Sequence, residues 1–296
     1  MTDLTQRTII PLKEADFALD GGAMFGIIPR PIWEKTNPAD AGQRIDLATR
    51  CLLIIDDTQT ILIDAGIGTR WSERHRQIYK ITGQDPRFVA ALDRHGLRPR
   101  DIDHVILTHL HFDHAGGLSF SDDQGRLQPA FPNATHWVQR RQWSWAHHPS
   151  PRDRGSFRPD DFAFLERTDA PELRLLDGVH RPLDGIEVFP CHGHTFGMQI
   201  VKIETPAQDY LFMADLVPTT SHIGAPYVMG YDLQPLKTVA EKQRFLHRCI
   251  HEDWIPIFQH DPTTAAARLM GDDDDLEWRP LQSLPDSLAL ASHTSS

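Results

Sequence analysis

The order of the predicted elements indicates an α/β or α+β protein with two β-rich halves, each covered on its outer side by helices. Two observations predict this class. Short runs of β-branched and apolar residues, typical of buried strands, recur through both halves of the chain. Segments with helical spacing accompany the strands in each half. No short-period repeat is visible, and periodicity alone does not choose between the two classes.

The first half is predicted to begin with an edge strand, because Pro11 limits the pairing of that segment. A Gly-rich turn over 20–26 and an extended segment over 27–33 come next. A hairpin then turns at 56–59. The strands expected in this half cover 8–12, 47–55, 60–64 and 102–107, and the helices cover 73–82 and 86–95.

The second half carries the longest predicted helix, over 235–251, which has a strongly amphipathic pattern. A hairpin is expected around the acidic run 272–275, which is a solvated turn and lacks the ligand pattern of a calcium loop. The strands expected here cover 135–138, 173–176, 185–189, 198–204, 209–213, 254–258, 265–269 and 276–281. The shorter helices cover 140–147 and 162–167.

We expect one domain over 1–282. Within it, residues 120–170 have the character of an insertion that could shape specificity. The serine-rich residues 283–296 are expected to fray.

The composition is that of an ordinary globular protein, with 40% hydrophobic and 24% charged residues in a chain of 296. The net charge of −11 disfavours nucleic acid as a partner. No apolar run is long enough to span a membrane, and the first residues lack the apolar core of a secretory signal. Cys51, Cys191 and Cys249 have no metal-binding spacing, so free buried thiols in the cytoplasm are expected.

Four potential metal ligands fall within six residues directly after the predicted strand 102–107: His109, His111, Asp113 and His114. Imidazole and carboxylate suit zinc, iron, manganese or cobalt, and the absence of thiolates disfavours a closed structural zinc site. One loop supplies more donors than one open site needs. The cluster therefore predicts two metals, with further ligands later in the chain. A merely solvated or pH-sensitive histidine cluster is the weaker interpretation.

His109-x-His111-x-Asp113-His114 resembles the HxHxDH signature of the metallo-β-lactamase superfamily. The resemblance extends over about 45–262 and implies a four-layer αβ/βα sandwich. It also implies three later ligands at strand ends, which match His194, Asp215 and His260. His192 is a rival to His194, which the flanking Gly193 and Thr195 favour.

The resemblance implies a dinuclear centre that holds two divalent ions, each with its own set of ligands. Zinc is the first choice for these ions, and iron, manganese or cobalt are the alternatives. One metal would be held by His109, His111 and His194, the other by Asp113, His114 and His260, and Asp215 would bridge them. A hydroxide between the metals would attack the substrate, and Asp113 would carry a proton to the leaving group. Asp64, at the end of strand 60–64, would support the metal loop.

Within the superfamily, the local features are most similar to those of quorum-quenching N-acyl-homoserine lactonases. These features are Asp20–Gly26, Leu62–Gly66, His109–Gly117, Asp215 and His260-Asp261. The resemblance implies that the substrate is a small lactone or ester. A methyl-parathion-type phosphotriesterase, or a thioesterase or other esterase, would use the same ligands and remains the alternative. A non-enzymatic or redox protein on this fold is a third interpretation, disfavoured because redox relatives usually replace a metal-loop histidine with a carboxylate.

Some members of the lactonase group have a tyrosine three residues after the bridging aspartate, where this chain has Pro218. His222, Tyr227 or Tyr231 could take over the stabilisation of the oxyanion. Met24 and Phe25 could line the substrate pocket, and the segment 24–33 could form the contact of a homodimer.

Overall fold

The computed structural model describes residues 6–271 and 276–284. The acidic turn at 272–275 and most of the expected frayed tail, from 285 onwards, lie outside the described residues. Leu284, within that expected tail, is buried against the core.

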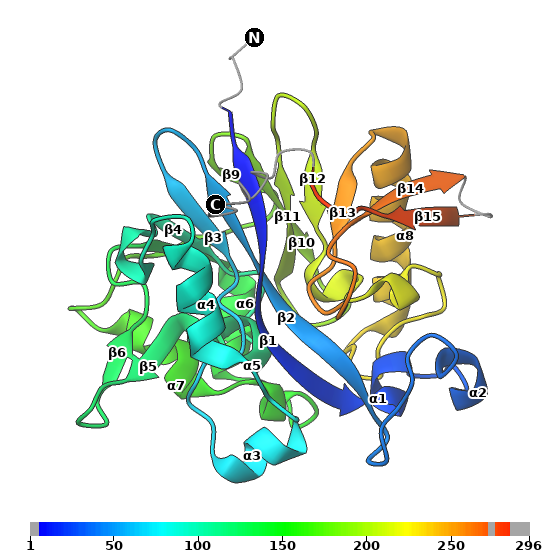
Figure 1. Cartoon of the computed structure of the whole chain (residues 1–296), viewed down its shortest axis with the longest axis horizontal. Helices are drawn as coiled ribbons and strands as arrows, with labels where there is room; N and C mark the ends of the chain where they lie inside the picture. Colours follow the sequence, from blue (N-terminus) through cyan, green and yellow to red (C-terminus); the bar gives the residue numbers. More distant parts are fainter. Residues whose placement is uncertain (1–5, 272–275, 285–296) are drawn as a thin grey trace, which may run out of the picture.

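Two sheets form the centre of the described structure (Figure 1). The six-stranded sheet has the order β1-β2-β3-β4-β7-β8, with β1 (Thr8–Asp20), β2 (Arg44–Ile55), β3 (Thr60–Ile63), β4 (His104–Ile106), β7 (Thr135–Gln139) and β8 (Leu173–Leu176). The five-stranded sheet has the order β13-β12-β11-β10-β9, with β9 (His180–Leu183), β10 (Ile186–Cys191), β11 (Met198–Ile203), β12 (Tyr210–Phe212) and β13 (Ile255–Ile257). Two small hairpins are β5 (Ser119–Ser121) with β6 (Leu127–Pro129), and β14 (Ala267–Gly271) with β15 (Leu276–Pro280).

Helices lie on the outer faces of both sheets (Figure 1). On the side of the six-stranded sheet, α4 (Gln84–Asp93) and α6 (Arg140–His147) pack their apolar residues onto the strands. On the far side of the five-stranded sheet lies α8 (Pro235–His251). The remaining helices are short: α1 (Gly21–Phe25), α2 (Arg30–Trp33), α3 (Glu73–Ile78), α5 (Phe112–Ala115) and α7 (Pro159–Phe162). The predicted four-layer αβ/βα sandwich is thus confirmed.

The alternation of side chains along β2 shows why this layering forms. Leu52 and Ile54 enter the core between the two sheets, whereas Cys51 and Leu53 enter the core beneath α4 and α6. Successive residues of a strand point to opposite faces, so a strand that is buried on both faces must be apolar throughout. This accounts for the continuous run from residue 51 to residue 55.

The segment 13–33 differs from the prediction. β1 continues to Asp20 instead of ending at residue 12, because it pairs with β2 along its whole length through an irregularity between Lys13 and Ala15. The expected Gly-rich turn is helix α1, which begins where the Asp20 carboxylate accepts a hydrogen bond from Ala23 N at 2.7 Å. The expected extended segment ends in helix α2. Pro31 lies in its first turn, where a backbone N–H has no partner within the helix, so the missing N–H of proline removes no helical hydrogen bond.

Residues 120–170 are only partly separate from the sheet. They include β7, which pairs in parallel with β4 on one side and β8 on the other, so this part belongs to the central sheet. The flanking part does reach the predicted site, since Phe157 forms a backbone bridge with His111.

The described helices are neither long nor apolar enough to cross a membrane. All three cysteines, which lie within the described residues, are buried and unbridged as expected.

The topology brings several strand ends to one edge. β3, β4 and β7 run parallel in one sheet, and β12 and β13 run parallel in the other. Parallel strands present their carboxyl ends at the same edge, so the loops after them can meet.

Glycines allow the loops after β3 and β4 to pack backbone against backbone. Ala65 N donates to His114 O at 2.8 Å, and Gly117 N donates to Gly66 O at 3.2 Å. A Cβ on Gly117 would collide with Ala65 O. The loop that carries the histidine cluster therefore has a fixed position relative to β3.

We expect Gly117→Ala to lower the free energy of unfolding by about 1–3 kcal/mol, because the two loops must separate to admit the methyl group. Urea denaturation followed by tryptophan fluorescence measures this loss. Gly155→Ala is the matched control, since a Cβ there meets no atom within 4 Å. Equal stability of the two variants would contradict the role of the close packing.

Candidate metal centre

Seven buried histidine and aspartate side chains meet where the loops after the strands of both sheets converge. In the described part of the chain they form two groups in which the potential ligand atoms lie within 4.8 Å of one another. The first group contains His109, His111, His194 and Asp215, and the second contains Asp113, His114 and His260. The structure thus brings together the seven residues that the sequence predicted as ligands, and their roles as ligands stay a prediction.

The Asp215 carboxylate lies between the two groups. Its Oδ2 is 3.1 Å from His194 Nε2 and 3.9 Å from His109 Nε2. Its Oδ1 is 3.0 Å from His260 Nε2 and 3.3 Å from His114 Nε2. Each oxygen thus faces a different group, which is the arrangement that a bridging carboxylate requires.

Asp113 and His111 complete the two groups. Asp113 Oδ2 is 3.6 Å from His260 Nε2, and its Oδ1 is 3.9 Å from His114 Nε2. His111 Nδ1 is 3.1 Å from His194 Nε2. His111 comes from the loop after β4 and Asp113 from the short helix α5 that follows it, and each contributes to a different group.

The donor set fits metal ions better than it fits a network of hydrogen bonds alone. Across the described residues, the buried atom His109 Nε2 has no hydrogen-bond partner. Buried polar atoms are nearly always satisfied, and convergent imidazole nitrogens cannot all donate to one another. A divalent cation at each group would satisfy them.

The electrostatics of His109, His111 and Asp215 favour the forms that bind a metal, whereas the nearby carboxylates raise the pKa of His114 and His194. Burial lowers the pKa of both His109 and His111 well below the ordinary value, so both rings are neutral, and neutral imidazole is the form that binds metal. Burial acts to raise the pKa of Asp215, but His114, His260 and His194 together hold it well below its ordinary value. Asp215 is therefore ionised, which is the form in which a carboxylate binds a metal.

Asp64, which the resemblance implied would support this loop, is hydrogen-bonded to it. Its Oδ1 accepts from Thr108 N at 2.7 Å, and its Oδ2 accepts from Thr108 Oγ1 at 2.7 Å and from His114 Nδ1 at 2.9 Å. Because Nδ1 of His114 carries the proton, Nε2 is left free to bind a metal. Asp64 holds a positive φ of 57°, a conformation that aspartate tolerates better than most residues.

Two further hydrogen-bond acceptors that orient clustered histidines were not predicted from the sequence. Asp232 Oδ1 accepts from His194 Nδ1 at 2.9 Å, and the Ala48 carbonyl accepts from His260 Nδ1 at 2.8 Å. Each orients one ring in the same way as Asp64. Asp232 lies in irregular chain before α8, far in sequence from His194, and no local pattern marks it.

Glu14 was also missed. It is almost fully buried, and its carboxylate accepts hydrogen bonds from Ile67 N at 3.1 Å, Gly68 N at 3.2 Å and Thr49 Oγ1 at 2.6 Å. It thereby anchors the loop after β3, against which the histidine loop packs.

His192, the rival to His194, lies outside both groups and accepts a hydrogen bond from Gly197 N at 3.0 Å through its Nδ1. It is half-buried, and burial lowers its pKa to about 4.

A cavity of about 200 Å³ opens onto the two groups. Of the predicted pocket residues, Met24 and Tyr231 line it. Phe25, Tyr227 and His222 are absent from the described lining. The remaining lining residues are Leu19, Leu47, Tyr79, His111, Phe112, Asp113, Gly155, Ser156, His194, Asp215, Met229 and His260.

His222 is unsuited to stabilising an oxyanion. Its Nε2 donates to Met24 O at 2.9 Å, its Nδ1 accepts from Thr219 Oγ1 at 2.8 Å, and its ring stacks on Phe25. Burial lowers its pKa to about 4, so the ring is neutral and both of its nitrogens are used.

Tyr231 and Tyr79 are the phenols in the described lining of the cavity. Burial raises the pKa of Tyr231 and that of Tyr79, so both remain protonated donors at neutral pH.

Comparisons with known proteins agree with this site. The sequence is 28% identical over 176 residues to an N-acyl homoserine lactonase from a Bacillus species, a match that covers 55% of this chain and 61% of that relative. The chain thus spans less than two thirds of that curated relative's length.

Two solved structures resemble the whole chain. One, described as a probable metal-dependent hydrolase from Staphylococcus aureus, is 30% identical, with a TM-score of 0.84 and coverage of 96% of this chain and 100% of its own. The second is AidC, a dizinc quorum-quenching lactonase in complex with the product N-hexanoyl-L-homoserine. It is 20% identical, with a TM-score of 0.77 and coverage of 95% and 97%.

A family model described as the metallo-beta-lactamase superfamily matches residues 44–263, which contain all seven clustered side chains. The chain belongs to the metallo-beta-lactamase superfamily.

Proposed function

We propose that this protein is a metal-dependent hydrolase that opens a lactone ester, with N-acyl-homoserine lactones as the leading substrate class. The observation that carries this proposal is Asp215, whose two carboxylate oxygens each face one group of imidazoles beside an open cavity. The curated relative and AidC, both lactonases by name, support the choice of substrate class.

In this proposal, His109, His111 and His194 would hold one metal, Asp113, His114 and His260 would hold the other, and Asp215 would be shared between the two. Zinc is favoured because imidazole and carboxylate suit it and because AidC is a dizinc enzyme. Two divalent ions supply a nucleophile at neutral pH and polarise the substrate carbonyl.

The chain's own residues divide the remaining work. Asp113 lines the cavity and carries a carboxylate that can pass a proton to the leaving alcohol oxygen. Tyr231 lines the same cavity and donates a hydrogen bond to the oxyanion, in place of the tyrosine that some relatives have where this chain has Pro218. Apolar side chains suit an acyl tail, namely Leu19, Met24, Leu47, Phe112 and Met229.

Two further proposals concern the setting of the enzyme. The segment around α1 and α2 exposes 84% of Ile27 and 48% of Ile32, which supports a homodimer contact that sedimentation would detect.

The unbridged buried thiols suit a reducing compartment, which supports a cytoplasmic location.

Asp232→Asn should weaken the binding of one metal by about 10- to 100-fold, because an amide cannot supply the charge that polarises the His194 ring. Competition against a chromophoric chelator measures both metals in one titration. Asp177→Asn is the matched control, since that carboxylate is 73% exposed and pairs with Arg140 at the surface. Two unaltered metal affinities in Asp232→Asn would argue against His194 as a ligand.

A matched assay on the metal-loaded protein tests the substrate class. It compares short- and long-chain N-acyl-homoserine lactones with a phosphotriester, a thioester and a simple ester. We expect lactones to be turned over fastest, and Asp113→Asn to lower their kcat by about 100-fold or more. Faster turnover of another class would keep the metal centre and reject the lactonase assignment.

Tyr231→Phe should lower kcat for the best lactone by up to about 100-fold with little change in metal content, because it removes one donor to the oxyanion. Tyr227→Phe is the control, since that ring packs edge-on against Phe25 outside the described cavity lining. Similar rates in both variants would exclude Tyr231 from the reaction.

A further inference from the structure

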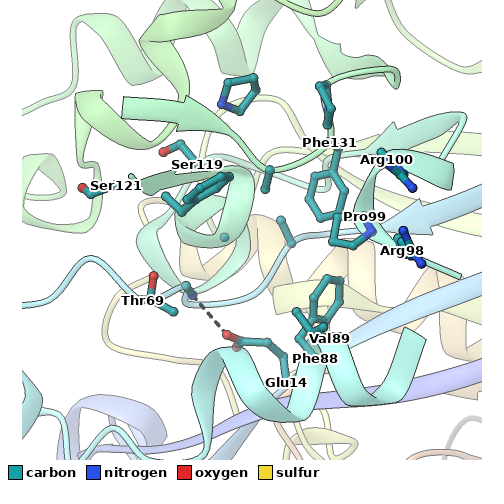
Figure 2. Close-up of a pocket in the computed structure, with 17 residues that line it drawn as sticks. Glu14, Thr69, Phe88, Val89, Arg98, Pro99, Arg100, Ser119, Ser121 and Phe131 are labelled. Atoms are coloured by element: carbon teal, nitrogen blue, oxygen red, sulfur yellow. Dashed lines mark hydrogen bonds between the residues drawn. The ribbon is translucent and has the colours of Figure 1, made fainter. Parts of the chain in front are cut away.

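A second, larger cavity lies behind the histidine loop, with a volume of about 540 Å³ (Figure 2). Its walls come from the loop after β3, from α4, from residues 98–100, from the start of the β5–β6 hairpin and from residues 129–132. Among the described residues, it shares no lining residue with the cavity at the metal centre. An occupant here would therefore leave the metal centre open.

The walls of this cavity are mainly apolar. Phe88 and Phe131 meet edge to face with ring centroids 6.0 Å apart, and Phe131 is almost fully buried. Val89, Pro99 and Pro132 extend the same surface. Figure 2 shows the two phenylalanine rings on the same side of the cavity as Val89 and Pro99. The volume falls within the range of small-molecule sites, and such walls suit an aliphatic body.

The charged side chains at this cavity are mostly basic. Arg98 and Arg100 flank Pro99 at the edge of the pocket, and both are exposed (Figure 2). The acidic side chain in the lining is Glu14, whose carboxylate already accepts from Thr49 and from the backbone of Ile67 and Gly68.

We propose that this cavity is a binding site for a small amphipathic carboxylate, with the aliphatic chain against Phe88 and Phe131 and the carboxylate paired with Arg98 and Arg100. The assignment rests on an apolar wall beside two exposed guanidiniums, which are groups that bind carboxylates strongly and in a defined geometry. Two sources share this chemistry: a medium-chain fatty acid, and the ring-opened acyl-homoserine that the proposed lactonase would release. Only the second source rests on the proposed function.

The test is calorimetric titration of the metal-loaded enzyme with decanoate and, separately, with N-decanoyl-homoserine, both below their micellar concentrations. We expect at least one of them to bind in a manner that the double variant Arg98→Gln/Arg100→Gln weakens by about tenfold. Arg279→Gln is the control, since Arg279 is exposed on β15, on the opposite side of the molecule (Figure 1). Decanol, which lacks the carboxylate, should bind more weakly than decanoate and should not respond to the arginine variants.

A second variant tests the apolar wall. Val89→Trp fills the cavity from α4, and we expect it to abolish the arginine-dependent binding while the melting temperature stays close to that of the parent. Arginine-dependent binding of decanoate identifies a fatty-acid site, and binding of N-decanoyl-homoserine alone identifies a product site. Absence of binding by both probes, or binding that the double arginine variant does not weaken, would overturn the proposal. Because the readout is binding, this result is independent of whether lactones prove to be substrates.

Discussion

The position of the Asp215 carboxylate between two groups of imidazoles is the constraint on which the rest of this structure depends. One oxygen faces His194 and the other faces His260, each at about 3 Å. These residues follow β12, β10 and β13 of the five-stranded sheet, whereas their partners follow β4 of the six-stranded sheet. The two sheets must therefore pack with their carboxyl-terminal edges together, and the apolar core between them holds that arrangement.

Burying this many polar groups is costly unless each has a partner, and the surrounding residues supply those partners one by one. Asp64, Asp232 and the Ala48 carbonyl each accept a hydrogen bond from the Nδ1–H of one histidine, which directs Nε2 towards the centre. The Glu14 carboxylate accepts hydrogen bonds from the backbone N–H groups of Ile67 and Gly68, so the buried N–H groups of the loop after β3 also have partners. The glycines of both loops then allow direct backbone packing. The geometry of the site is thus set by many short contacts behind the ligands.

The two cavities differ in chemistry as well as in place. The cavity at the metal centre combines the clustered carboxylates and imidazoles with apolar walls and two phenols. The cavity behind the histidine loop has an apolar wall and arginines at its edge. Both border the same loop from opposite sides, because Phe112 and Asp113 face one cavity and Gly117 and Ser119 face the other. A short loop between two sheets can therefore carry a reaction centre on one side and a separate pocket on the other.

The resemblance to the metallo-β-lactamase superfamily implied the four layers, the three later residues of the cluster and the place of Asp64. The sequence by itself determined the α/β or α+β class, most strands, the helices 140–147 and 235–251, and the local cluster of His109, His111, Asp113 and His114. It could do so because strand and helix periodicity are local, and because His109 to His114 are adjacent in the chain. Only the tertiary structure decided the roles of Asp232, Glu14 and Tyr79, the use of His222 as a packed ring, and the helices α1 and α2. These depend on contacts between residues that are far apart in sequence, or on caps such as Asp20, whose partners a linear pattern does not specify.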